Sequence, residues 1–239
     1  MAKGFTVKAK SPVAKQKAPE WDYNLARQLI RGKTIVFCLP GRGVSYNFLK
    51  SFVSLSFDLV QAGAAIQISQ DYSSMVNFAR CKCLGANVLR GPNQLPWDGK
   101  LNYDYQLWID SDIVFNVEKF YQLILNAIPA EAITKEEVKQ IVKNEKGEDV
   151  EQTGFTLKVD SEKERELVAG WYCTEDGKTT SVAHWLDEDD FRTNGGVMNH
   201  ETIDSISKRK KPFTVDYTGF GWLLIKNGVF ENEGLPYPW

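Results

Sequence analysis

The sequence predicts an α/β protein in which a mostly parallel sheet is flanked by helices. Short apolar segments rich in β-branched residues alternate with segments whose apolar side chains have helical spacing. Such alternation implies right-handed crossovers and a sheet that is covered on both faces. The chain has 239 residues, of which 43% are hydrophobic and 25% are charged, as in ordinary soluble globular proteins. We therefore expect a single domain over residues 21–239.

The first half of this domain carries the alternation most clearly. Residues 33–39 form a β-branched run that ends at a Gly-rich loop, and residues 46–62 have helical spacing. The further elements expected are strands at 64–68, 87–89 and 105–110, and helices at 75–84 and 115–128. Ligands of open α/β sheets bind beyond the carboxyl ends of the strands. The loops after residues 39 and 110 are therefore the first places to look for chemistry.

Residues 131–167 differ from the segments on either side. They are crowded with Glu and Lys, and Thr134 with Glu137 resembles a capping box before a short exposed helix. We interpret this stretch as a charged excursion from the core. In the region that follows, residues 168–239, we expect strands at 213–217 and 221–225 around a Gly-Phe-Gly bend.

Charge and cysteine content limit the partners and the compartment. Residues 1–20 hold five lysines and few large apolar side chains, which predicts a flexible basic arm. A net charge of −2 gives no support for a nucleic-acid surface. No apolar run is long enough for a membrane span, and Cys81 and Cys83 lack the spacing of zinc ligands. We expect a cytoplasmic, reducing location.

Asp110-Ser111-Asp112 is the strongest chemical feature. The triplet follows the strand expected at 105–110, where a turning chain allows both carboxylates to approach one cation. Mg²⁺ and Mn²⁺ prefer such oxygen ligands and leave coordination positions for substrate phosphates. By itself the triplet is better explained as a solvated turn at a strand end. Its apolar flanks, Leu107-Trp108-Ile109 and Ile113-Val114-Phe115, favour a built site.

With these flanks, the string Leu-Trp-Ile-Asp-Ser-Asp-Ile at 107–113 resembles the metal-binding segment of GT-A glycosyltransferases. The resemblance extends over roughly residues 33–233. Residues 77–80 are similar to the family's arginine-bearing helix, and residues 168–172 to its small-residue strand beside the donor sugar. Residues 216–225 are similar to the Gly-Phe-Gly region where the acceptor site begins.

The resemblance implies a nucleotide-binding half at 33–130 and a smaller mixed acceptor-side half at 168–239. It implies transfer of a sugar from a nucleoside diphosphate donor, such as a UDP- or GDP-sugar, to a hydroxyl of a glycan, lipid or protein. Mn²⁺ or Mg²⁺ is the implied cofactor, with Asp112 as the direct ligand and Asp110 on the metal or the ribose. The implied donor-side residues are Pro40, Arg42, Ser69, Gln70, Asp71, Arg80, Asp110, Ser111, Gly170 and Trp171, and the acceptor-side residues are Trp185, Gly219, Phe220 and Gly221.

Several of these residues have a simpler reading. Arg80 either pairs with Asp110 or the diphosphate, or forms an ordinary surface ion pair. The alternative for Gly41 and Gly43 is that they only shape a turn around Arg42. Large aromatic residues usually pack in a core, but Trp185 is the expected exception, because the polar run Asp187-Glu188-Asp189-Asp190 follows it.

The sequence departs from the family pattern after its Gly-Phe-Gly segment. Family members commonly continue to an acidic base and a metal-binding His, whereas this sequence stops at Trp239. We expect either one domain of a longer polypeptide or a base located elsewhere, with Asp216, Asp189 and Asp190 as candidates. His184 and His200 precede the segment and do not match the late His by order.

Two other functions remain open. A sugar-1-phosphate nucleotidyltransferase has a similar sheet, but residues 39–45 lack the closing basic residue that its loop needs. A non-catalytic module that binds a sugar nucleotide or a glycan within a larger protein needs no base at all.

Overall fold

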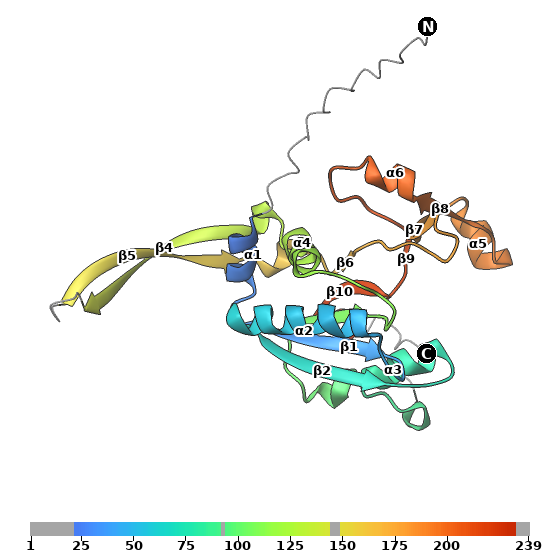
Figure 1. The fold of residues 1–239 in the computed structure, drawn as a ribbon, viewed down its shortest axis with the longest axis horizontal. Helices are drawn as coiled ribbons and strands as arrows, with labels where there is room; N and C mark the ends of the chain where they lie inside the picture. Colours follow the sequence, from blue (N-terminus) through green and yellow to red (C-terminus); the bar gives the residue numbers. More distant parts are fainter. Residues whose placement is uncertain (1–21, 92–93, 144–148, 233–239) are drawn as a thin grey trace, which may run out of the picture.

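A computed structural model describes residues 22–91, 94–143 and 149–232 (Figure 1). Its centre is a five-stranded sheet with the strand order β2-β1-β3-β10-β6. β2 and β3 both pair in parallel with β1, and β10 lies antiparallel between β3 and β6. The strands are β1 (Thr34–Pro40), β2 (Ala65–Asp71), β3 (Tyr105–Ile109), β6 (Leu167–Ala169) and β10 (Trp222–Lys226). The prediction of a mostly parallel sheet flanked by helices is confirmed, with β10 as the antiparallel member.

Alternate side chains of the central strands enter two separate cores. Ile35 and Phe37 of β1 face the helices α1, α2 and α4. Val36 and Cys38 of the same strand face α3 on the other side of the sheet. This alternation follows from the two-residue period of a strand. The helices are α1 (Tyr23–Leu29), α2 (Tyr46–Gln61), α3 (Val76–Cys83) and α4 (Val117–Ala127).

β3 is buried along its whole length, including one polar side chain. The Gln106 amide donates to Tyr103 Oη at 2.8 Å and accepts from Trp108 Nε1 at 2.9 Å. Because a buried amide without partners is costly, these two bonds account for a polar residue in the middle of the sheet. They also hold the strand whose end carries Asp110.

Residues 133–159 form a β-hairpin where we predicted a short helix. β4 (Ile133–Lys143) pairs antiparallel with β5 (Asp149–Val159), and Glu137 lies opposite Phe155. The capping-box pattern at Thr134 is a local signal, and here cross-strand pairing overrides it. The hairpin projects from the body in Figure 1. The excursion is therefore real, but it is a strand pair.

The short strand predicted at 87–89 is also wrong. Val88–Arg90 is a 3-10 turn. The side-chain amide of Gln94 bonds the backbone of Asn87 twice: its oxygen accepts from Asn87 N, and its nitrogen donates to the Asn87 carbonyl. Those bonds satisfy backbone groups that a strand would have paired with a neighbour. The other 3-10 turns are Pro96–Gly99, Ala130–Ala132 and Ser161–Lys163.

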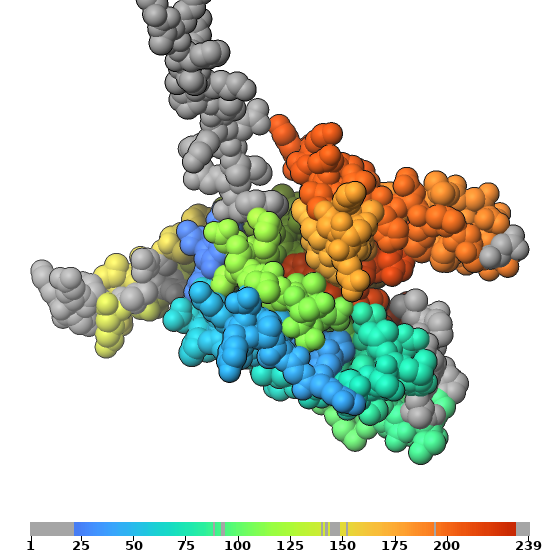
Figure 2. All heavy atoms as spheres, turned by 45° about the vertical axis from the view of Figure 1, so that its right-hand side comes forward, coloured from blue at the N-terminus to red at the C-terminus, as the bar shows by residue number. Residues whose placement is uncertain are grey.

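A second, three-stranded sheet follows β6, with the order β8-β7-β9 and antiparallel pairs only. Figure 2 shows its orange residues standing apart from the blue and green residues of the central sheet. The strand predicted at 213–217 is reduced to Tyr217–Thr218, whereas the one predicted at 221–225 is present as β10. The elements here are β7 (Thr179–Trp185), α5 (Glu188–Asn194), β8 (Met198–Thr202), α6 (Ile203–Ser207) and β9 (Tyr217–Thr218).

Across the described residues, no helix is long and apolar enough to cross a membrane. The basic arm predicted at 1–20 and the segment after 232 lie outside the described residues.

Candidate functional site

The end of β3 is tied to two distant segments by backbone contacts. Asp110 N donates to the Gly221 carbonyl at 3.1 Å, and Gly221 N donates to Tyr172 Oη at 3.1 Å. Ile113 N closes a turn onto the Asp110 carbonyl at 3.1 Å. The apolar flanks of the triplet place it at a strand end, and the insertion of β10 beside β3 brings Gly221 to it. The turn that carries both carboxylates is therefore fixed from two sides.

Arg80 reaches this turn from α3 on the far side of the sheet. Its Nη2 lies 3.5 Å from Asp110 Oδ2, and its guanidinium lies 4.8 Å from the centre of the Phe220 ring. The contact with Phe220 is a cation–π interaction, which holds the guanidinium in place. Arg80 Nε is buried and has no hydrogen-bond partner among the described residues. One donor of the guanidinium is therefore left for a group that the described residues do not supply.

The Asp110 carboxyl is only partly accessible. Burial raises the pKa of Asp110 above its ordinary 3.8, Arg80 acts in the opposite direction, and Asp112 raises the pKa further. Burial has the largest effect because a charged carboxylate loses hydration there. A cation placed between the two carboxylates would offset both the burial and their mutual repulsion.

Asp112 is exposed, and over the described ranges its carboxylate makes no hydrogen bond or ion pair. No group of three Asp, Glu, His or Cys side chains suited to a metal ion is present in the described part of the chain. The chemistry of the two carboxylates suits Mg²⁺ or Mn²⁺ as a partial ligand set, which waters or phosphate oxygens would have to complete. They do not fit a metal held by protein ligands alone.

The loop after β1 lies against the end of β2. Gly41 N donates to the Asp71 carbonyl at 3.0 Å, and the Gln70 amide donates to the Gly41 carbonyl. The Arg42 guanidinium stacks on Tyr72 at 3.9 Å from the ring centre. Gly41 has a φ of +145°, a conformation open to glycine, so here the glycine does shape the turn.

Lys82 adds a second positive charge beside this loop. Its Nζ lies 3.5 Å from Asp71 Oδ1 and donates to the Tyr72 carbonyl at 3.1 Å. Lys82 and Arg80 leave the same helix toward different strands, one toward β2 and the other toward β3. Together with Arg42 they place three cations along the carboxyl ends of β1, β2 and β3.

A small cavity of about 100 Å³ lies between the loop after β1 and the triplet. Ser111 forms part of its wall and lies in contact range of Gly41. Its lining residues are Leu39, Pro40, Gly41, Arg42, Gly43, Val44, Phe48, Gln70, Ile109 and Ser111. Pro40, Arg42, Gln70 and Ser111, which were predicted from distant parts of the sequence, therefore share one hollow.

Other predicted donor residues have structural tasks. The Ser69 hydroxyl donates to the Cys83 carbonyl and so faces α3. A methyl group built on Gly170 would overlap the indole of Trp222. The backbone is equally close, since Gly170 N donates to the Trp222 carbonyl at 3.0 Å. The small residue at position 170 is explained by that close approach. Trp171 beside it is 44% exposed and remains available.

Tyr172 explains the two glycines on the acceptor side. Methyl groups built on Gly219 or Gly221 would meet its ring and hydroxyl. Burial raises the pKa of Tyr172, and Asp110 raises it further, whereas Gly221 N and Arg80 lower it. Tyr172 is thus packed against the Gly-Phe-Gly bend, close enough to Asp110 for that carboxylate to affect its pKa.

The three candidate bases lie in the second sheet and its helix. Asp216 Oδ2 lies 3.3 Å from His184 Nδ1 and accepts from Trp185 N at 3.1 Å. Asp189 and Asp190 are in the first turn of α5, which Figure 1 shows away from α3 and the ends of β1 and β2. The Trp185 ring is half-buried and packs on Phe191 of α5, with 4.4 Å between the ring centres.

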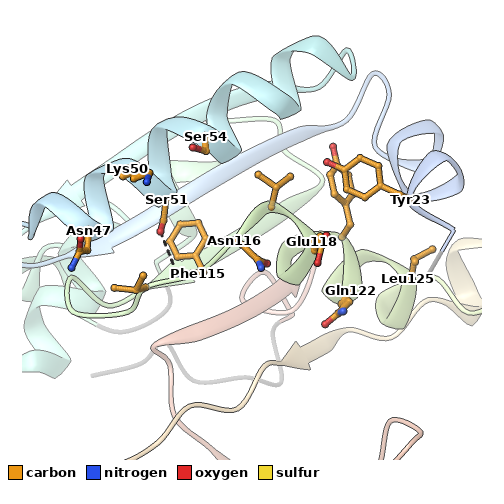
Figure 3. Close-up of a pocket in the computed structure, with 13 residues that line it drawn as sticks. Tyr23, Asn47, Lys50, Ser51, Ser54, Phe115, Asn116, Glu118, Gln122 and Leu125 are labelled. Carbon is orange, nitrogen blue, oxygen red and sulfur yellow. Dashed lines mark hydrogen bonds between the residues drawn. The ribbon is translucent and has the colours of Figure 1, made fainter. Parts of the chain in front are cut away.

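A larger cavity of about 900 Å³ runs between α2 and α4, beside the segment that follows the triplet (Figure 3). Ser51 on α2 accepts from Phe115 N at 3.3 Å at its base. Its walls include Tyr23, Lys50, Asn116 and Glu118. It shares no lining residue with the cavity beside Ser111, and neither Asp110 nor Arg80 lines it, so the two cavities are separate.

Sequence reasoning missed Tyr72 and Lys82, and it named Tyr172 only as a candidate sugar-contacting aromatic, without its contact with the Gly-Phe-Gly bend. Tyr72 directly follows Asp71 at a strand end, beside residues already assigned to the donor. Lys82 lies two residues after Arg80 on α3, but helical spacing predicts that the two point apart. The place of Tyr172 depends on β10 lying between β3 and β6, which no local pattern indicates.

Comparisons of this chain with models of protein families, with curated proteins and with solved structures found no match.

Proposed function

We propose that this chain is a metal-dependent glycosyltransferase with a GT-A sheet, which binds a nucleoside diphosphate-sugar at the carboxyl ends of β1, β2 and β3. The observation that carries the proposal is the convergence on Asp110. Arg80 from α3, Gly221 before β10 and Tyr172 after β6 all meet at that turn, directly or through one another. The four sequence segments that resemble a glycosyltransferase, around Arg80, Asp110, Tyr172 and Gly221, are thus linked by contacts.

The distribution of charge supports a diphosphate ligand. Arg42 and Lys82 lie beside the loop after β1, and Arg80 lies beside the carboxylate turn. Guanidinium groups bind phosphate through paired charge-assisted hydrogen bonds. The unpaired Nε of Arg80 is favoured to take such a bond, because a buried donor without a partner costs about 1–3 kcal/mol.

Each residue then has a stated task. Asp112 and Asp110 hold Mn²⁺ or Mg²⁺, which when bound stabilises the negative charge that develops on the leaving diphosphate. Arg80 orients Asp110 and contacts the diphosphate, and Arg42 holds the nucleotide side of the donor. The bond between the sugar and the diphosphate oxygen breaks with its electron pair on the diphosphate, and the acceptor oxygen forms the new bond to the sugar.

Asp216 is the favoured base of the three candidates. It lies five residues before Gly221, so the Cα atoms of the two are at most about 18 Å apart, and the Gly221 carbonyl accepts from Asp110 N. Asp216 also contacts His184, which in turn lies 3.4 Å from Glu201. A proton taken from the acceptor hydroxyl can therefore be held at Asp216 with His184 as a neighbour. The acceptor, a glycan, lipid or protein hydroxyl, and the cytoplasmic location stay predictions.

Turnover of UDP- and GDP-sugars with Mn²⁺ tests the proposal. We expect release of the nucleoside diphosphate from at least one donor, and its loss in Asp112→Asn. An Asp216→Asn variant should keep donor binding while losing transfer to an added acceptor. No release from any donor, together with no binding of any donor, would overturn the proposal.

A donor-binding module without transfer is the second candidate. It is favoured by the contacts of Asp216, whose carboxylate is already shared between His184 and Trp185 N. Donor binding without diphosphate release in the turnover experiment distinguishes it from the enzyme.

A further inference from the structure

The β4–β5 hairpin is a long two-stranded sheet with little support from the body. Its strands have eleven residues each, which corresponds to roughly 35 Å of length. Among its described residues, those at the base (Ile133, Leu157 and Val159) pack on the core, whereas farther out Ile141 is 76% exposed and Phe155 is 73% exposed. An isolated two-stranded hairpin is at best marginally stable in water. Additional strands on an open edge would stabilise it.

β4 presents the freer of the two edges. Near the base, β5 lies beside α1 (Figure 1). In the described part of the chain no strand lies on the outer side of β4. Such an edge is a template for pairing with another strand.

We propose that β4 pairs antiparallel with β4 of a second copy of this chain, about a two-fold axis at Val138. All eleven residues of β4 then have a partner. Ile133 lies opposite Lys143 of the second copy at one end, and Lys143 lies opposite Ile133 of the second copy at the other. Glu137 lies opposite Lys139 of the second copy, and the two-fold axis produces this pair twice. Opposite charges directly across a strand pair are stabilising.

Charge selects this register over its neighbours. The neighbouring registers that keep each side chain on the same face of the sheet shift the pairing by two residues. Such a shift moves the two-fold axis by one residue along β4. An axis at Glu137 places that carboxylate opposite its own copy, and an axis at Lys139 does the same with two ammonium groups. Lysines on an edge normally discourage pairing. In the register centred on Val138 each Lys139 instead faces a carboxylate.

Glu137 is the available acid on this edge. Lys139 pairs with Glu151 at 3.2 Å, and Glu136 pairs with Lys158 at 3.3 Å within the hairpin. Among the described residues Glu137 has no ion pair. Glu137 can therefore contact Lys139 of the second copy without giving up a bridge of its own, and the Lys139 ammonium has three donors to divide between Glu137 and Glu151. The resulting four-stranded sheet is an isologous interface, and it does not depend on the proposed sugar transfer.

Two charge reversals test the interface in the full chain. Glu137→Lys places two lysines across each contact, and Lys139→Glu places two glutamates there. Sedimentation over a concentration series should show a wild-type mass of twice 27.1 kDa and a single-chain mass for each variant. A mixture of the two variants should recover the dimer, because positions 137 and 139 are both lysine in one chain and both glutamate in the other. Each contact then joins opposite charges again.

Glu136→Lys is a stricter control: it reverses the charge one residue away and also removes the bridge to Lys158 within the hairpin, but it lies opposite position 140 of the second copy, which is an uncharged glutamine. It should remain a dimer. Recovery on mixing also separates a lost interface from misfolding, and circular dichroism of each variant alone checks the fold. A wild-type chain that stays at 27.1 kDa throughout, a dimeric Glu137→Lys variant, or failure of the mixture to associate would each overturn the proposal.

Discussion

Arg80 and Asp110 come from a helix and a strand that are 30 residues apart in the chain. Their ion pair is about three-quarters removed from solvent on both sides, with 24% and 28% of the side chains exposed. It therefore differs from an ordinary surface pair, which contributes little. Phe220 on one side of the guanidinium keeps it from turning into solvent. This arrangement makes Arg80 the most informative single residue of the site.

Arg80→Gln should weaken binding of a nucleoside diphosphate. A lost charge-assisted contact of about 1.5–3 kcal/mol corresponds to roughly 10- to 100-fold in the dissociation constant. Calorimetric titration with UDP and GDP in the presence of Mn²⁺ measures the change. Arg90→Gln is the matched control, because Arg90 forms an exposed pair with Asp98 away from the triplet. Equal effects of both variants would remove Arg80 from the binding site.

Gly170→Ala should destabilise the fold. The added methyl group meets the Trp222 indole in a packed sheet, and such overpacking costs about 1–3 kcal/mol. Gly43→Ala is the control, because no atom lies within 4 Å of the added carbon and the backbone conformation is ordinary. Urea denaturation of both variants gives the free energies of unfolding. A Gly170→Ala variant as stable as Gly43→Ala would mean that Trp222 moves aside freely.

The pKa of Asp110 predicts a pH-dependent stability difference. Burial raises that pKa above 3.8, so the folded chain binds a proton there more readily than the unfolded chain. Between 3.8 and the raised value, the contribution of Asp110 to the free energy of unfolding falls as pH rises. Relative to Asp110→Asn, the wild type should therefore lose stability through this window and then level off. Urea denaturation at several pH values checks the sign, and a wild type that gains stability there contradicts it.

The sequence predicted that Asp110 lies at a strand end, because the continuous apolar run before it stops there and a buried strand ends where its apolar run ends. It proposed the pairing of Arg80 with Asp110 only through a resemblance, beside an equal alternative. The contact of Arg80 with Phe220, and the place of Tyr172, depend on which strand lies next to β3. No periodicity within one segment carries that information.

The hairpin is the element in which local signals and tertiary structure disagree most. Thr134 and Glu137 have the spacing of a helix start, yet both lie in an eleven-residue strand. Val138 and Ile141 suit a strand, and β5 provides a partner for every residue of β4. The second disagreement, at 87–89, has the opposite cause, because a single side chain, Gln94, satisfies the backbone locally.

Replacing residues 138–154 with a short Gly-Ser turn should leave the body folded. The side chains removed are mostly exposed, and the packed base at Ile133, Leu157 and Val159 remains. The thermal midpoint should move by less than about 4 °C, which corresponds to well under about 2 kcal/mol for a chain of this size. Circular dichroism melts provide the measurement at one fixed concentration. Loss of the cooperative transition would show that the hairpin supports the body.

Across the whole molecule, the site proposed for chemistry and the edge proposed for assembly lie at different places. The carboxyl ends of β1, β2 and β3 carry Asp110, Asp112 and three nearby cations, while the hairpin projects from the other end of the body (Figure 1). Strand alternation predicted the sheet that creates the first region. The hairpin and the separate sheet next to Asp216 both depend on antiparallel pairing of strands that irregular loops connect. The sequence pattern does not reveal that pairing.

Calorimetric titration of nucleoside diphosphates with and without Mn²⁺ tests the central claim most directly. We predict binding of UDP or GDP that strengthens at least about 10-fold with Mn²⁺, and an Asp112→Asn variant that loses this gain. Asp98→Asn, which removes an exposed acid paired with Arg90, should behave as wild type. Absence of binding, or binding that neither Mn²⁺ nor Asp112→Asn changes, would contradict a donor-and-metal site at Asp110-Ser111-Asp112.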